Sequence, residues 1–384
     1  MPILNLLSLT CFVGALCVRL IDPLVPEIAR DLDVAATTAA LLATAFALPY
    51  ALGQPVLGPL GDAIGKARII KTALAVLAAM LALSAVAPSY EVLLATRLLG
   101  GLAAGGIIPL AFAIVGDRFP YEQRQVALTR VLMAAMLGQL VSVIGSGLIA
   151  SFSSWRMVMA TAAAVTLVVL AATLKQLKPR PDAVRRRFTI AGVRAGYARV
   201  FANPRASACF LTVFLEGVTV FGLFPYIAVL LEQRGAGGIR EAGFIIAGMG
   251  LGGLAYTLAV KPLLTRLGGM FGLMRSGGLI AAAGLLVAGL APSWPAQMAA
   301  FVVMGFGFYS LHNSIQTQAT ELAPENRGAA VALHAFFFFL GQATGPIFYR
   351  IGIASVGATA TTAAAAAVVA CLGFWLAGRL ARVE

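Results

Sequence analysis

Charge is scarce in this sequence relative to its length. Of 384 residues, only 11% are Asp, Glu, Lys or Arg, whereas 60% are hydrophobic and the mean hydropathy is +0.92. A soluble protein of this size needs a charged surface, and too few charged residues are present to cover one. The composition therefore excludes a soluble fold and indicates a chain whose outer surface faces lipid.

Cysteine and histidine are scarce as well, with four and two residues. The cysteines all fall inside apolar stretches at spacings that no metal site uses, so we interpret them as small core residues. His312 and His334 have no Cys or carboxylate nearby in the sequence and make a poor metal pair. No nucleophile–base pair is recognisable either. We therefore expect no metal site, no cofactor and no enzymatic activity.

Twelve apolar stretches are long enough to cross a bilayer, which takes about 20 residues in a helix. We expect helices because backbone polar groups in lipid must be satisfied internally. The first stretch lacks a basic flank and a cleavage site, so it is interpreted as a span and not as a signal peptide. The stretches lie near residues 3–25, 36–60, 69–87, 91–116, 126–150, 154–174, 206–231, 241–262, 271–291, 295–320, 327–350 and 355–378.

The formal net charge of +13 raises the possibility of a nucleic-acid partner, but its distribution along the chain argues against one. If both termini are cytoplasmic, most of the basic residues fall in or beside the cytoplasmic connections. That asymmetry follows the positive-inside rule for membrane proteins. The sequence therefore predicts a multi-pass protein with both termini in the cytoplasm and no nucleic-acid partner.

The chain contains an internal repeat at an offset of 203 residues, the separation between Gly138 and Gly341. Two separate regions superpose at this one offset, which indicates duplication, as is common among secondary transporters. We predict an all-α membrane protein of twelve transmembrane helices in two pseudo-symmetric six-helix bundles, at 1–174 and 206–384. The superposed segments are 137–139 with 340–342, Arg124 with Arg327, 59–60 with 262–263, and Gly65 with Gly268.

The segment between the bundles, residues 175–205, is strongly basic. From Thr189, a plausible helix cap, apolar residues recur at helical spacing as far as Phe201. A basic amphipathic helix of this kind lies flat on the anionic membrane surface, so membrane lipids are expected partners. We favour a plain tether over a regulatory element.

The connection after the second stretch carries a recognisable motif, which reads GPLGDAIGKAR from Gly58 to Arg68. It resembles the signature G-x-L-x-D-R-x-G-R-K of the major facilitator superfamily, and the fourth stretch carries that family's R-x-x-x-G element from Arg97 to Gly101. The resemblance implies a twelve-helix transporter whose two halves rock about a central site. It also implies gating roles for residues in the connection after the second stretch and in the eleventh stretch. These residues are Gly58, Asp62, Gly65, Lys66, Arg68, Gly345 and Pro346.

Stretches ten and eleven resemble the branch of that family that contains sugar-efflux permeases and drug:proton antiporters. The resemblance implies a monomer in the inner membrane of a bacterium that exports a small organic solute against proton entry. One departure concerns stretch five, where Val143 stands in place of the proline of the G-P-x-x-G-G motif. The Gly-Pro pair is present only in the second half, at Gly345 and Pro346.

Charged residues inside the apolar stretches are the candidate proton-coupling groups, because charge at membrane depth is costly and usually functional. Glu216 has no basic residue within a helical turn, so we expect it to carry a proton. Asp22 is a second candidate. An ion pair of Asp22 with Arg19 or Arg97 is the alternative, and it would make this aspartate structural.

Polar residues in the stretches are the candidate substrate contacts. Arginine at these depths favours an anionic or neutral polar substrate over a lipophilic cation. This leaves anion uptake, by symport or facilitated diffusion, as an alternative to export; an intramembrane enzyme or a lipid-handling receptor is a more distant one. The candidates are Arg19, Gln54, Arg97, Tyr226, His312, Asn313 and Gln316.

Overall fold

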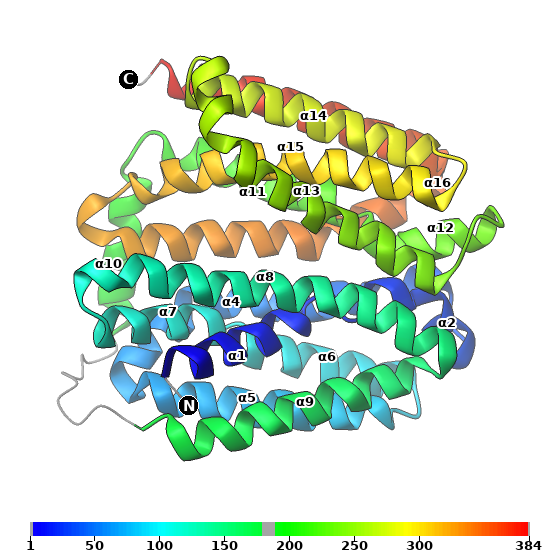
Figure 1. Cartoon of the computed structure of the whole chain (residues 1–384), viewed down its shortest axis with the longest axis horizontal. Helices are drawn as coiled ribbons and strands as arrows, with labels where there is room; N and C mark the ends of the chain where they lie inside the picture. The colour runs from blue at the N-terminus through cyan, green and yellow to red at the C-terminus, as the bar shows by residue number, and fades with distance from the viewer. Residues whose placement is uncertain (1–2, 179–188, 383–384) are drawn as a thin grey trace. The chain divides into compact units, whose positions relative to one another are not determined.

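A computed structural model of the chain describes residues 3–178 and 189–382, with the side chains of 62, 121 and 122 left out. The chain divides into two compact units, residues 1–193 and 194–384. Every regular element in the described residues is a helix (Figure 1). The predicted all-α class is therefore confirmed.

The described part of unit 1 before residue 179 contains nine α-helices, and four of the predicted stretches within it correspond to uninterrupted or nearly uninterrupted helices. The first stretch is split into α1 and α2, and the fourth is split into α6 and α7. The helices are α1 (Ile3–Leu16), α2 (Val25–Asp31), α3 (Ala36–Ala39), α4 (Leu41–Ile64), α5 (Lys66–Ala85), α6 (Tyr90–Ala104), α7 (Ile107–Arg118), α8 (Tyr121–Phe152) and α9 (Trp155–Gln176).

Unit 2 begins within α10 (Ile190–Phe201) and continues with six further α-helices among its described residues, which end at 382. Stretches eleven and twelve run together as α16, where Gly357 has a φ of 84° and separates two helical segments. The remaining helices are α11 (Ala206–Phe221), α12 (Ile227–Gln233), α13 (Ile239–Arg266), α14 (Met270–Leu290), α15 (Trp294–Thr320) and α16 (Arg327–Leu380).

The first membrane stretch of each unit is broken near its middle, which the sequence analysis did not anticipate. In unit 1, α1 ends at Leu16 and a 3-10 turn, η1 (Asp22–Leu24), follows before α2. In unit 2, α11 ends at Phe221 and η2 (Phe224–Tyr226) follows before α12. Pro23 and Pro225 stand at the start of the two turns. A proline lacks the backbone N–H that would continue the helix, so it favours the break.

Side chains from neighbouring helices satisfy carbonyl groups close to both breaks. The Ser142 hydroxyl of α8 donates to the carbonyl of Leu16 at 2.6 Å. In unit 2, the Tyr349 hydroxyl of α16 donates to the carbonyl of Thr219 at 2.9 Å. Irregular backbone at membrane depth is tolerated only where protein or water supplies such partners. The breaks are therefore supported features of both units.

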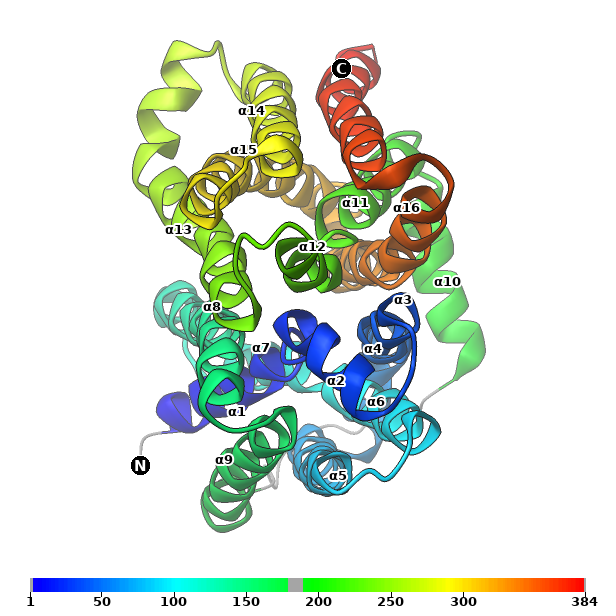
Figure 2. The same ribbon diagram turned by 90° about the vertical axis from the view of Figure 1, so that its right-hand side faces the viewer.

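The same close helix contacts recur in the two units. In unit 1, α1 packs on α8 at Gly138, where an added Cβ would collide with the carbonyl oxygen of Phe12. In unit 2, α11 packs on α16 at Gly341, where an added Cβ would collide with the carbonyl oxygen of Phe214 (Figure 2). Gly138 and Gly341 are equivalent at the 203-residue offset. The sequence repeat is thus also a repeat of packing, with small residues at the interfaces as in other membrane bundles.

The expected amphipathic helix corresponds to α10. The backbone N–H of Gly192 donates to Thr189 Oγ1 at 3.2 Å, which confirms the predicted cap. Val200 is buried in the core of unit 2, and the Asn326 side chain donates to the carbonyl of Gly196 at 3.3 Å. The most basic part of the predicted linker, at 179–188, lies outside the described residues.

Candidate functional site

The buried acid of unit 2 lies on α11 and has a histidine partner. Glu216 is fully buried, and its Oε2 is 2.8 Å from Nδ1 of His312 on α15. Its other oxygen, Oε1, is buried with no hydrogen-bond partner among the described residues. The sequence analysis selected both residues but assigned them to different roles. The structure brings them together.

A second histidine lies beside this pair. The rings of His312 and His334 are 5.1 Å apart between centroids and inclined at 60°, and His334 comes from α16. Nε2 of His334 is buried, and no described atom forms a hydrogen bond with it. We call Glu216, His312 and His334 the acid–histidine cluster. It joins three helices of unit 2 through groups that all exchange protons readily.

Aromatic rings enclose the acid–histidine cluster. The ring of Phe308 stacks on His312 at 5.0 Å between centroids, and Phe338 lies 4.5 Å from the same imidazole. Within the described part of unit 2, the buried polar residues include no Lys or Arg. The cluster is therefore a desolvated site in which a single proton can reside on the carboxyl group or on an imidazole. In either state one group donates to the other.

Unit 1 contains a buried ion pair in place of that cluster. Arg19 Nη1 donates to Asp22 Oδ2 at 3.3 Å, and both residues lie in the segment where the first stretch is broken. Asp22 is 1% exposed, and its Oδ1 has no hydrogen-bond partner within the described residues. The sequence analysis left Arg19 and Arg97 open as partners of Asp22. The structure pairs Asp22 with Arg19.

Arg97 on α6 is buried against backbone carbonyl groups. Its Nη1 donates to the carbonyl of Cys17 at 3.4 Å, and its Nε donates to the carbonyl of Leu42 at 3.5 Å. The guanidinium carbon lies 4.2 Å from the ring centroid of Phe46. Arg97 thus supports the broken segment of unit 1. Together with Arg19 and Asp22, it leaves one excess positive charge in this buried site.

Two of the remaining predicted substrate contacts form hydrogen bonds to backbone carbonyl groups. Gln54 donates to the carbonyl of Gly105 at 2.8 Å, and the Tyr226 hydroxyl donates to that of Pro346 at 2.8 Å. The first bond connects α4 to the end of α6, and the second connects η2 to α16. Asn313 is half-buried and Gln316 is exposed, although both lie near His312 along α15.

The predicted gating residues of unit 1 cluster where α4 meets α5. Gly65 joins these helices with a φ of 113°, a conformation that favours glycine. Lys66 Nζ lies 2.6 Å from a carboxylate oxygen of Asp117 at the end of α7. Arg68 is exposed. Asp62 belongs to α4, but its side chain is outside the described set.

Gly58, predicted as a gating residue, does not mark a close helix contact, because an added Cβ there would meet no atom within 4 Å. In unit 2, Gly345 does pack closely, since an added Cβ would lie 2.7 Å from the Cα of Gly222. Pro346 follows inside α16. The predicted Gly-Pro element therefore lies against the broken segment after α11.

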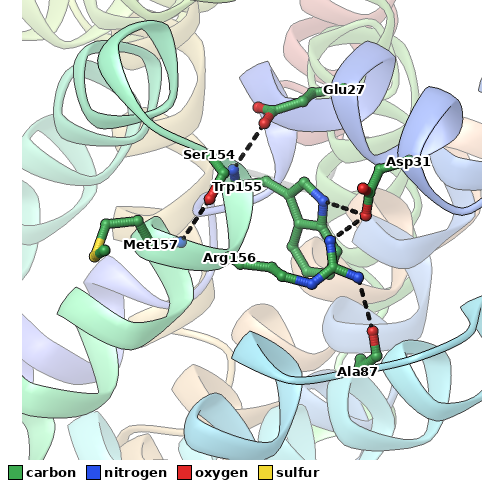
Figure 3. A network of polar contacts seen from close by, with 7 residues as sticks. All are labelled: Glu27, Asp31, Ala87, Ser154, Trp155, Arg156 and Met157. Carbon is green, nitrogen blue, oxygen red and sulfur yellow. Dashed lines mark hydrogen bonds and ion pairs between the residues drawn. The ribbon is translucent and has the colours of Figure 1, made fainter.

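One polar network in unit 1, around Trp155 and Arg156, was not predicted from the sequence. The backbone N–H of Trp155 donates to Glu27 at 3.0 Å, and its indole N–H donates to Asp31 at 3.1 Å. Arg156 pairs with the same Asp31 carboxylate and donates to the carbonyl of Ala87 at 3.0 Å (Figure 3). The network joins α2, the connection between α5 and α6, and the start of α9. The hydrogen bond from Arg156 holds the pKa of Asp31 below its ordinary value.

Residues 7–346 match the family described as the Major Facilitator Superfamily. The chain belongs to this superfamily. Multidrug resistance protein 1 of Bacillus subtilis (strain 168) is 24% identical over 345 residues, which cover 90% of this chain and 88% of that protein. The chain is therefore a multi-pass transporter of the Major Facilitator Superfamily with bacterial relatives.

Two solved structures of this superfamily fold are also similar. A bacterial homologue of the human lysosomal transporter Spinster has a TM-score of 0.78 at 17% identity, covering 99% of this chain and 97% of that one. The human organic anion transporter MFSD10 has a TM-score of 0.73 at 17% identity, covering 97% and 98%. At these identities the likeness establishes the fold alone. The expected twelve-helix, two-bundle transporter fold is thereby confirmed.

Proposed function

We propose that this transporter exports a small organic solute in exchange for protons, and that the acid–histidine cluster is its proton-coupling site. The principal support is the buried 2.8 Å contact between Glu216 and His312, in a unit whose described buried residues include no Lys or Arg. A charge in such a place is costly unless it is paired, and it commonly serves transport. The export direction is supported by the similarity to Multidrug resistance protein 1.

The coupling step follows from the chemistry of this pair. When Glu216 is protonated, the site is neutral, and its O–H donates to His312 Nδ1. When the proton leaves Glu216, the carboxylate requires either a protonated imidazole or another cationic or polar partner. The two protonation states therefore differ in the free energy of desolvation, so they favour different facing states of the carrier. Protons and solute are thereby linked through one equilibrium.

The first experiment identifies a solute by thermal stabilisation of the purified protein, with sugars, organic acids and drugs each tested at two pH values. A ligand that binds only the folded state raises the unfolding temperature. Solutes whose stabilisation depends on pH then enter proteoliposomes that contain a pH-sensitive dye. We expect the solute to evoke proton movement in the direction opposite to its own.

The decisive variants are Glu216→Gln and Asp22→Asn in those proteoliposomes. We expect Glu216→Gln to abolish solute-evoked proton movement and to retain solute-for-solute exchange, because exchange requires no net proton transfer. Asp22→Asn tests whether the buried aspartate of unit 1 shares the coupling role. If both variants keep full proton-driven efflux, the proposed mechanism is wrong.

Anion uptake is the second candidate function. It is supported by unit 1, whose described buried residues include two cations, Arg19 and Arg97, and one acid, Asp22. An excess of buried positive charge favours an anionic group on the substrate. Accumulation of an organic anion in right-side-out vesicles would support uptake, whereas loss of that anion only from preloaded vesicles would support export.

A further inference from the structure

A groove runs along the surface of unit 2 between α11 and the second segment of α16. Its volume is about 410 Å³, and every lining side chain is apolar. Leu211 is 46% exposed and Trp375 is 40% exposed, so the groove is open to the surroundings of the protein. The lining residues are Leu211, Leu215, Ala367, Val368, Cys371, Leu372 and Trp375.

The groove extends across roughly one leaflet. At a rise of about 1.5 Å per residue, Leu211 and Leu215 lie about 7 Å and 13 Å from the start of α11 at Ala206. Ala367 lies about 18 Å along α16 from Arg379, in its last turn. The hydrocarbon core is about 30 Å thick, so this span is close to half of it. The length of the groove therefore matches the depth of a single acyl chain.

Charged and polar side chains continue the groove at its outer end. Val368, Cys371, Trp375 and Arg379 recur every three or four residues and so follow one stripe of α16, and Arg382 comes two residues after the end of that helix. Both arginines are exposed, and neither forms an ion pair with any residue that the structure describes. On α11, the exposed Ser207 precedes Leu211 and Leu215 at intervals of four. An apolar groove thus leads to two cations and a hydroxyl group.

An apolar groove within a bilayer is filled by hydrocarbon. Water has no polar partners along this lining, and an empty groove would forfeit dispersion contacts on its open side. An acyl chain is the apolar filler that the bilayer supplies. Basic residues near the membrane surface attract anionic headgroups, and an arginine can bind a phosphate with two hydrogen bonds. We propose that this groove holds one acyl chain of an anionic phospholipid, whose phosphate binds Arg379 and Arg382.

Trp375 provides a direct test, because bromine atoms on an acyl chain quench a tryptophan that they touch. The protein with Trp155→Phe and Trp294→Phe retains Trp375 as its single tryptophan. It is placed in micelles containing phospholipids with the same brominated chains and either a phosphoglycerol or a phosphocholine headgroup. We expect half-maximal quenching at a roughly tenfold lower mole fraction of the anionic lipid, since two arginines attract its headgroup.

Three variants locate the binding site. Arg379→Gln combined with Arg382→Gln should remove the preference for the anionic headgroup. Arg266→Gln, at an exposed arginine in the last turn of α13, is the matched control and should keep it. Ala367→Phe fills the groove and should reduce quenching by both lipids. Ala367→Leu serves the same purpose if the phenylalanine variant does not fold.

Cys371 gives a second measurement on the unaltered chain. It is exposed and lines the groove, whereas Cys11, Cys17 and Cys209 are buried. Addition of the anionic lipid should slow modification of Cys371 by a membrane-permeant maleimide. Equal quenching by both headgroups, together with unchanged labelling, would mean that only bulk lipid fills the groove and would overturn the proposal. Stronger quenching by a brominated free fatty acid than by either phospholipid would overturn it as well, in favour of a single-chain ligand.

Discussion

The two units share their packing but differ in their buried chemistry. Each has a broken first stretch, and each has a glycine contact between that stretch and the fifth stretch of the unit, at Gly138 and at Gly341. Unit 1 buries two arginines and an aspartate, whereas unit 2 buries a glutamate and two histidines. Arginine stays protonated in proteins, while carboxyl and imidazole groups exchange protons. A duplicated scaffold has thus retained its contacts while its two buried sites diverged, one to an aspartate with two arginines and the other to a glutamate with two histidines.

The largest expected effect comes from removing the partner of Glu216. His312→Phe keeps an aromatic ring in place but deletes the hydrogen bond to the acid. We expect solute-evoked proton movement to fall by at least about tenfold, since loss of a positioned proton-transfer group commonly costs about 10²–10⁴-fold in rate. Proteoliposomes with a pH-sensitive dye measure it.

The control for that variant is Ser314→Ala on the same helix, because this serine bonds only to a carbonyl of its own helix among the described partners. It should transport normally. The corresponding change in unit 1, Arg19→Gln, should reduce proton movement less than His312→Phe does. An equal loss in both units would remove the functional distinction between their buried sites.

The second prediction concerns the feature that the units share. Gly138→Val and Gly341→Val each place a side chain against a carbonyl of the neighbouring helix. We expect each to destabilise the protein by about 1–3 kcal/mol through overpacking. Thermal unfolding in detergent measures both variants.

Gly145→Ala, on the same helix as Gly138, is the control because its added Cβ would meet nothing within 4 Å. It should be neutral or slightly stabilising, because alanine favours helix over glycine. If only one of the two valine variants is destabilised, the two contacts are not equivalent. The repeat would then be one of sequence and not of packing.

The third prediction tests whether Arg97 stabilises the broken first stretch of unit 1 or serves substrate binding through its charge. Arg97→Gln removes the guanidinium that donates to the carbonyls of Cys17 and Leu42. Buried groups left without partners cost about 1–3 kcal/mol, so the unfolding temperature should fall. Arg68→Gln, at an exposed site, should change stability by less than about 0.5 kcal/mol. Unchanged stability in Arg97→Gln would indicate that Arg97 is present for substrate and not for the broken helix.

The smallest effect is expected at the network of Figure 3, which includes Asp31 and Arg156. Because Arg156 lowers the pKa of Asp31 in the folded state, their interaction stabilises unit 1 above the ordinary carboxyl pKa. That stabilisation is lost as the pH falls through the lowered value. Asp31→Asn should therefore cost less than about 1 kcal/mol near neutral pH, as exposed pairs do, and nothing in strong acid.

Unfolding curves recorded from neutral to acidic pH measure this dependence. Asp33→Asn is the matched control, because Asp33 lies two residues away, is exposed and forms no ion pair within the described residues. It should unfold with the pH profile of the unaltered chain. A stability difference for Asp31→Asn that does not change with pH would exclude the ion pair as its cause.

Sequence reasoning predicted the helices well because lipid imposes strong demands on composition. A stretch of about 20 apolar residues has few alternatives to a helix, so hydropathy located the stretches. It did not locate the breaks before Asp22 and after Phe221, because the broken segments are as apolar as the helices around them. Pro23 and Pro225 were the available signal. The separation of Pro23 and Pro225 is close to the 203-residue offset of the repeat. A search for prolines at this offset could therefore have revealed both breaks.

The buried sites were only partly predictable. The Arg19–Asp22 pair could be anticipated because its members lie three residues apart. Glu216 was also identifiable, since an acid in an apolar stretch is rare. Its bond to His312 depends on how α11 packs against α15, 96 residues further along the chain, and local spacing carries no information about that. His334 was considered only as a metal ligand for the same reason.

Gly357 joins the two segments of α16. It is the one residue with non-helical dihedral angles inside α16, and Gly352 packs tightly against Thr361 across the turn. The two segments of α16 therefore form a helical hairpin and lie against each other close to its turn. His334 lies on the first segment, and Trp375 lines the surface groove on the second. The acid–histidine cluster and the surface groove are therefore built on the two arms of one helical hairpin.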